Sequence, residues 1–234
     1  MSKRLLIFIP GACPQQVGCS DRLWAAIAPH TDVYGDGDLG VNRFEILWED
    51  LITNISMGGL DLPLCFADFF QYLNDMGTRL KIINRIIAGI RSVFSVNAAV
   101  DIYAHSEGTI GAYEALRYFD DYPPFGEIVN FFTMGAALGF AWNKLVPTSN
   151  VRDRLLPANM DGAKPKVCQH WFNLCTQGDP FGAALKPAYD VDEDFVNLPA
   201  LGCSPVQFLC SHDSYFDPQN LAICRDILAA KANA

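Results

Sequence analysis

The sequence lacks the features of membrane-spanning and nucleic-acid-binding proteins. It contains no run of about 18 apolar residues, so no segment is expected to cross a bilayer. Only 17 residues are Lys or Arg against 26 Asp or Glu, and the formal net charge is -9. A surface of this charge would repel a phosphate backbone and an anionic membrane. We therefore expect no nucleic-acid partner and no transmembrane segment.

Metal-ligand and signal-peptide patterns are missing as well. The chain has 8 cysteines, but none is spaced as CxxC or in a Cys/His ligand set, so we expect no metal. The apolar stretch at 5–9 is shorter than a secretory signal requires, and we expect a strand there. Cysteines such as Cys175 and Cys210 lie in apolar runs, where a free thiol behaves as a small hydrophobe. We expect reduced cysteines in a cytoplasmic protein, although a Cys13–Cys19 disulfide stays open.

Short apolar runs alternate with helix-like segments along the whole chain. Most of the runs are apolar on both faces, which is typical of parallel strands covered on both sides. The alternation predicts a single doubly wound α/β domain over residues 1–234, with helices on both faces of a mainly parallel sheet. The expected strands are 4–10, 43–49, 98–104, 127–134, 166–175 and 205–210, and the expected helices are 20–29, 66–92, 107–119 and 217–231.

Two stretches do not fit this alternation. Residues 136–165 mix apolar, proline and charged positions, and we expect them to form a short cap at the rim of the sheet. Residues 52–70 also border that rim. Apolar side chains in these stretches line an acyl pocket or simply cover the sheet, and the sequence leaves both options open: Leu138, Phe140, Trp142, Leu145, Phe66, Phe69 and Phe70.

Ser106 stands where a ligand-binding residue of such a sheet is expected. It follows the strand 98–104 almost directly, and ligands bind beyond the carboxyl ends of parallel strands. Ala104 and Gly108 lie two positions to either side, as a sharp strand-to-helix turn requires. The helix after it aims free N–H groups at the same place. The alternative is an ordinary helix-capping serine.

A serine nucleophile needs a base, and the chain has only 4 histidines. His105 is adjacent to Ser106 and its side chain should diverge, His30 ends an early helix, and His170 lies within a strand. His212 follows the last expected strand at the rim and is therefore the expected base, the alternative being a histidine of a surface loop.

The segment "AHSEG", residues 104–108, resembles the GxSxG nucleophile elbow of the α/β-hydrolase family, with alanine in place of the first glycine. The resemblance covers nearly the whole chain and implies a compact sheet of about six strands in the order 2-1-3-4-5-6. It also implies the chain order Ser, Asp, His for a catalytic triad. Ser106, Asp179 and His212 match that order, and no metal or organic cofactor is implied.

Asp179 occupies a Gly-Asp-Pro turn after the strand 166–175, where the family carries the acid. Its alternative is a simple turn former. Asp213 is too close to His212 in sequence to turn back on its ring. The acidic group Asp190, Asp192 and Asp194 is expected in a solvated loop.

The family's oxyanion hole uses the backbone N–H after the nucleophile and a second from the loop after the first strand. These positions are Glu107 and Ala12, with Cys13 as the alternative to Ala12. Pro10 departs from the family's His-Gly pattern without removing a needed donor. We expect the Glu107 side chain to point outward, stabilised by the helix N-terminus, with a substrate-selecting role left open.

These residues predict a serine hydrolase acting on a small acyl ester, with carboxylesterase or lipase-like chemistry leading. Thioesterase, amidase and acyl-transfer activities share the same triad. A non-catalytic receptor on a hydrolase scaffold is the alternative from another class. A flavodoxin-like cofactor binder shares the alternation, but no GxGxxG or Walker loop follows the first strand.

Overall fold

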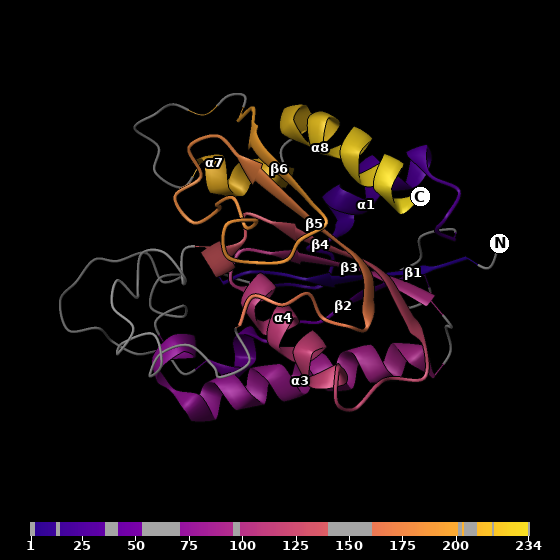
Figure 1. Ribbon diagram of the computed structural model, residues 1–234. Coiled ribbons are helices and arrows are strands. Elements are labelled where there is room, and N and C mark those ends of the chain that lie inside the picture. The colour runs from indigo at the N-terminus through magenta and orange to yellow at the C-terminus, as the bar shows by residue number, and fades with distance from the viewer. Residues whose placement is uncertain are drawn as a thin grey trace.

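The computed structural model contains one six-stranded parallel sheet with helices on both faces, as the sequence predicts (Figure 1). Its strand order is β2-β1-β3-β4-β5-β6, which confirms the expected order. The structure describes residues 3–12, 15–35, 42–52, 71–95, 99–139, 161–200, 203, 210–216 and 218–233. The strands are β1 (Leu5–Ile9), β2 (Arg43–Glu45), β3 (Ala99–His105), β4 (Glu127–Met134), β5 (Cys168–Thr176) and β6 (Glu193–Leu198). The helices are α1 (Asp21–Ile27), η1 (Ala28–His30), η2 (Glu49–Leu51), α3 (Met76–Phe94), α4 (Gly108–Phe119), α7 (Cys210–Asp213), η3 (Ser214–Phe216) and α8 (Pro218–Ala232).

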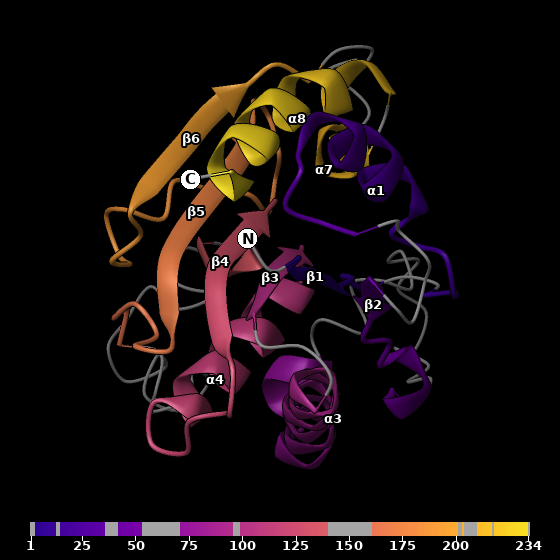
Figure 2. The same cartoon turned by 90° about the vertical axis from the view of Figure 1, so that its right-hand side faces the viewer.

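Strand β1 shows why both faces of the sheet must be covered. Its side chains alternate between the faces, and all five are buried. Leu5, Ile7 and Ile9 pack in one core with residues of α3 and α4. Leu6 and Phe8 pack in a second core with residues of α1 and α8. Figure 2 shows the two helix pairs on opposite faces of the sheet.

The sixth strand corrects the sequence analysis. The stretch 205–210 was expected to form the last strand, but the last strand of the sheet is β6, and Cys210 instead begins α7. Residues 205–209 lie outside the described residues. Among the described strands, β6 pairs with β5 alone, and its side chains are half-buried or exposed. Its polar sequence therefore does not match the apolar pattern of a strand buried on both faces.

The acidic residues near β6 match the expected solvated loop only in part: Asp190 and Asp192 are exposed loop residues, whereas Asp194 is not. Asp194 lies within β6, and its carboxylate accepts hydrogen bonds from the Asn173 side-chain amide at 2.7 Å and the Leu185 N–H at 2.7 Å. Asp192 pairs with Lys164 at 2.9 Å. These carboxylates bind the segment between β5 and β6 to the sheet.

The cysteines follow expectation in part. Cys175 is a buried free thiol, as its apolar run indicates, and burial raises its pKa to about 12. Cys19 is also free, which excludes a Cys13–Cys19 disulfide. Cys203, however, is disulfide-bonded, so the expectation of reduced cysteines is wrong at that position.

The expected cap falls largely on residues 140–160, which lie outside the described residues, as do residues 53–70 of the second irregular stretch. None of the helices in the described ranges combines the length and the apolar character that crossing a bilayer requires.

Candidate active site

Ser106 lies on a strained turn between β3 and α4. Its φ is 53°, in the left-handed region that non-glycine residues rarely adopt. Its N–H donates to the Met134 carbonyl at 3.0 Å, and its carbonyl accepts from the Thr109 N–H at 3.0 Å. Such strain costs on the order of 1–3 kcal/mol and is concentrated at functional sites. The turn therefore has the geometry that exposes a nucleophile at the carboxyl edge of the sheet.

Two glycines allow the chain to pack this closely. A Cβ on Gly108 would lie 2.3 Å from the Pro10 carbonyl oxygen. A Cβ on Gly11 would lie 2.5 Å from the Ser106 Cβ. Both distances are far below van der Waals contact, so any larger residue would push the loop after β1 away from the turn.

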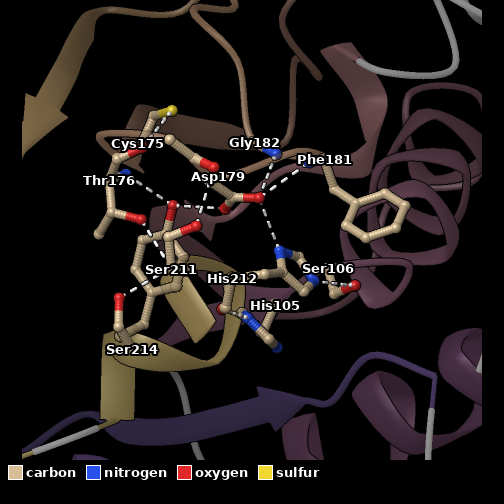
Figure 3. A network of polar contacts seen from close by, with 12 residues as sticks. His105, Ser106, Cys175, Thr176, Asp179, Phe181, Gly182, Ser211, His212 and Ser214 are labelled. Carbon is tan, nitrogen blue, oxygen red and sulfur yellow. Dashed lines mark hydrogen bonds and ion pairs between the residues drawn. The ribbon is translucent and has the colours of Figure 1, made fainter. Parts of the chain in front are cut away.

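The structure brings Ser106, His212 and Asp179 together from three separate segments of the chain (Figure 3). The Ser106 Oγ lies 2.7 Å from the His212 Nε2. The His212 Nδ1 lies 2.9 Å from the Asp179 Oδ1. The imidazole lies between the hydroxyl and the carboxylate, with one ring nitrogen facing each. His212 belongs to the short helix α7, and Asp179 follows β5.

Asp179 is held as a carboxylate. Burial alone would raise its pKa, but the hydrogen bond and charge of His212 and the Phe181 and Gly182 amides lower it to about 2. Both amides donate to Oδ1, at 2.9 Å and 2.8 Å. An ionised carboxylate can only accept, so the His212 Nδ1 carries the proton and Nε2 is free to accept from Ser106.

His105 diverges from Ser106, as expected, but it contacts the proposed base from behind. Its ring stacks on that of His212 with centroids 4.9 Å apart, and its Nε2 lies 3.2 Å from the His212 carbonyl oxygen. Because a carbonyl only accepts, the His105 Nε2 is the donor. Burial and the neighbouring His212 lower the pKa of His105 to about 3, which keeps this ring neutral.

Tyr215 is a site residue that the sequence analysis missed. Its hydroxyl lies 2.9 Å from the Asp179 Oδ2, on the oxygen that His212 does not use. Tyr215 and His212 are three residues apart in consecutive short helical turns, a spacing that places side chains on one side. That spacing is a signal only after His212 has been chosen as the base.

Residues of the expected oxyanion hole adjoin the serine. Glu107 is the N-cap residue of α4 and directly follows Ser106, so its N–H belongs to the turn between β3 and α4. Gly11 packs against Ser106, which brings the loop that carries Ala12 alongside. Gln15 stabilises this loop, since its side-chain amide donates a hydrogen bond to the Gly11 carbonyl at 2.7 Å. Cys13 lies outside the described residues.

The Glu107 side chain does not point outward as expected. It is 2 % exposed. The pKa of the buried Tyr72 is raised by burial, by Glu114 and, to a smaller extent, by Glu107. Residues 108–116 of α4, which directly follow Glu107, are all buried. The start of this helix therefore lies within packed structure, and the Glu107 side chain is buried with it.

The remaining sequence candidates contribute little that can be described. Leu138 is fully buried in the core shared with α3 and α4, so it covers the sheet. The other expected pocket residues, Phe140, Trp142, Leu145, Phe66, Phe69 and Phe70, lie outside the described residues. Over the described ranges, no three His, Cys, Asp or Glu side chains gather in a metal-binding group.

Comparison with known proteins adds little to this geometry. No family model and no curated protein matches the sequence. Among solved structures, the chain is similar to a protein of Pectobacterium atrosepticum named a "putative yden-like hydrolase", with 13% identity and a TM-score of 0.43 over 93% of this chain and 92% of that chain. A similarity of this strength supports no conclusion about activity.

Proposed function

We propose that this protein is a serine hydrolase that cleaves a carboxylic ester through an acyl-enzyme intermediate. The observation that carries the proposal is the hydrogen-bonded chain from Ser106 through His212 to Asp179 at the carboxyl edge of the sheet. The strained conformation of Ser106 supports it, because a capping serine does not require a left-handed backbone.

In the first half of the reaction, the Ser106 Oγ attacks the ester carbonyl and the His212 Nε2 accepts its proton. The ionised Asp179 stabilises the imidazolium that forms and keeps its Nδ1 directed at the carboxylate. The backbone N–H groups of Glu107 and Ala12 stabilise the negative oxygen of the tetrahedral intermediate. Removing one such donor from an oxyanion hole costs roughly 10²- to 10³-fold in rate.

In the second half, the bond to the leaving oxygen breaks and His212 returns the proton to the departing alcohol. Water then attacks the acyl group on Ser106 and loses a proton to His212. The bond to the Ser106 Oγ breaks, His212 returns the proton to that oxygen, and the carboxylic acid is released. The same groups would act on a thioester or transfer the acyl group to another alcohol. An ester panel of graded acyl length, with matched thioesters, separates these substrates.

The test is turnover of p-nitrophenyl esters and labelling by a fluorophosphonate in the wild type and in Ser106→Ala. We expect Ser106→Ala to abolish labelling and to lower kcat to near background. Ser95→Ala removes an exposed serine at the end of α3 and should behave as the wild type. Equal turnover by the wild type and Ser106→Ala would refute the proposal and favour a binding protein on this scaffold.

A further inference from the structure

Tyr215 joins β5 to the carboxylate of Asp179. Its side chain is 0% exposed, and its hydroxyl lies 2.8 Å from the Thr176 backbone N and 2.9 Å from the Asp179 Oδ2. A backbone N–H only donates and a carboxylate only accepts, so both bonds have a fixed direction. Thr176 donates to the Tyr215 oxygen, and the Tyr215 hydroxyl donates to Asp179.

We propose that Tyr215 is a positioning residue, which acts on the base through Asp179. The two carboxylate oxygens of Asp179 have separate partners. Oδ1 accepts from His212, Phe181 and Gly182, whereas Oδ2 accepts from Tyr215. The bond to Oδ2 opposes rotation of the carboxylate and keeps Oδ1 directed at the ring. This inference rests on the proposed function.

The surroundings of Oδ2 leave little room for a substitute donor. A Cβ on Gly182 would lie 2.5 Å from Oδ2, and a Cβ on Gly135 would lie 2.9 Å from it. Deleting the hydroxyl from a fully buried side chain leaves a gap of about one oxygen atom, which is smaller than the space that a water molecule needs. If the Tyr215 hydroxyl is removed, both Oδ2 and the Thr176 N–H therefore lose their bond to it without a replacement.

The hydroxyl keeps its proton under all working conditions. Burial, followed by the charge of Asp179, holds the pKa of Tyr215 well above its usual value. Because the side chain is fully buried, it is out of reach of a bound substrate. Its loss should therefore lower kcat and leave KM unchanged.

The experiment compares Tyr215→Phe with Tyr34→Phe in the full chain. Tyr34 is a matched control: it is 3% exposed, and its hydroxyl donates to the buried carboxylate of Asp101 at 2.8 Å. It lies by the start of β1, at the opposite edge of the sheet from Ser106. With p-nitrophenyl acetate, we expect kcat of Tyr215→Phe to fall roughly 10- to 100-fold, because displacement of about 1 Å costs up to about 10²-fold. Tyr34→Phe should keep the wild-type kcat while losing a similar amount of thermal stability.

A double-mutant cycle tests whether Tyr215 acts through Asp179. In an Asp179→Asn background, Tyr215→Phe should lower the residual kcat by less than about twofold, since coupled residues are not additive. The proton resonance of the His212 Nδ1–H gives a readout that needs no substrate. It should shift in Tyr215→Phe and stay unchanged in Tyr34→Phe.

The outcomes separate the inference from the proposed function. An unchanged kcat and an unchanged His212 resonance in Tyr215→Phe would overturn the positioning role, as would an equal loss of kcat in Tyr34→Phe or in the Asp179→Asn background. Turnover that survives Ser106→Ala would overturn the proposed hydrolase instead, and the resonance would then decide the role of Tyr215.

Discussion

Gly11→Ala tests how closely the loop after β1 must approach Ser106, the proposed nucleophile. The added Cβ would lie 2.5 Å from the Ser106 Cβ, 3.1 Å from its Oγ and 3.2 Å from the His105 carbonyl oxygen. Non-bonded carbon atoms are normally about 3.5–4.0 Å apart, so the loop and the turn must separate by about 1 Å or more. This separation would disturb ordered structure on both sides, because the backbone of Ser106 is hydrogen-bonded within its turn and the Gly11 carbonyl accepts from Gln15.

The separation would disturb one of two contacts on which the proposed reaction depends. It would move the Ala12 N–H away from its proposed place in the oxyanion hole, or move the Ser106 Oγ from its 2.7 Å contact with His212. A misplacement of about 1 Å costs on the order of 10²-fold in rate, and overpacking costs about 1–3 kcal/mol in stability. We therefore expect kcat/KM of Gly11→Ala to fall about 100-fold with p-nitrophenyl acetate.

Gly77→Ala is the control, a glycine substitution that adds a methyl group away from Ser106, His212 and Asp179. Its Cβ would come no closer than 3.3 Å to the Asp75 carboxylate, at the start of α3. We expect it to keep the wild-type kcat/KM. A Gly11→Ala variant that is folded by circular dichroism and retains full kcat/KM would refute the conclusion that this close approach serves catalysis.

Three further predictions concern charge and burial. Asp179→Asn should lower kcat by roughly 10⁴-fold, through the wrong imidazole tautomer. The pKa of Asp179 is lowered to about 2 in the folded protein, so its contribution to stability is present above about pH 4 and is lost as the pH falls toward 2. The free energy of unfolding of Asp179→Asn, measured in urea, should therefore depend less on pH in that window. The pKa of the buried His105 is lowered to about 3, and protonation of the unfolded state therefore destabilises the fold below about pH 6.5. His105→Gln, which keeps an N–H donor, should lose less Tm than the wild type between about pH 7 and pH 4, and an equal loss would contradict this origin. Glu114→Gln leaves the buried Arg79 without its counter-charge and should cost about 3–5 kcal/mol in the free energy of unfolding. Asp50→Asn breaks an exposed ion pair and should cost at most about 1 kcal/mol, and comparable losses in the two variants would refute this distinction.

Strands with neighbours on both sides were predictable from the sequence because their burial requires a run of apolar residues. Strand β1 is buried on both faces and appears as an unbroken apolar run. Strand β4, with neighbours on both sides in the sheet, was predicted with the observed bounds, Glu127–Met134. Strand β6 lies at the end of the strand order, next to β5. Its side chains are half-buried or exposed, so its sequence has no continuous apolar run by which it could have been predicted.

The sharp turn at Ser106 was predictable for a similar reason. A sharp turn needs small neighbours, and Ala104 and Gly108 mark it within five residues of sequence. Tyr215 carries no comparable mark, since a buried tyrosine in a polar segment is not unusual. Its role depends on where its hydroxyl lies relative to Asp179, and that position is set by the packing of η3 against the end of β5.

By itself, the sequence determined the alternating strands and helices of a doubly wound α/β sheet and a sharp turn at Ser106, because periodicity and the demand for small residues are local properties of the chain. The strand order 2-1-3-4-5-6 followed from the resemblance to the α/β-hydrolase family, and the structure has that order. Only the tertiary structure decided that His212 lies within hydrogen-bond distance of both Ser106 and Asp179. That distance depends on the packing of α7 beside the ends of β3 and β5, and the residues that separate these segments contain no local pattern that specifies it.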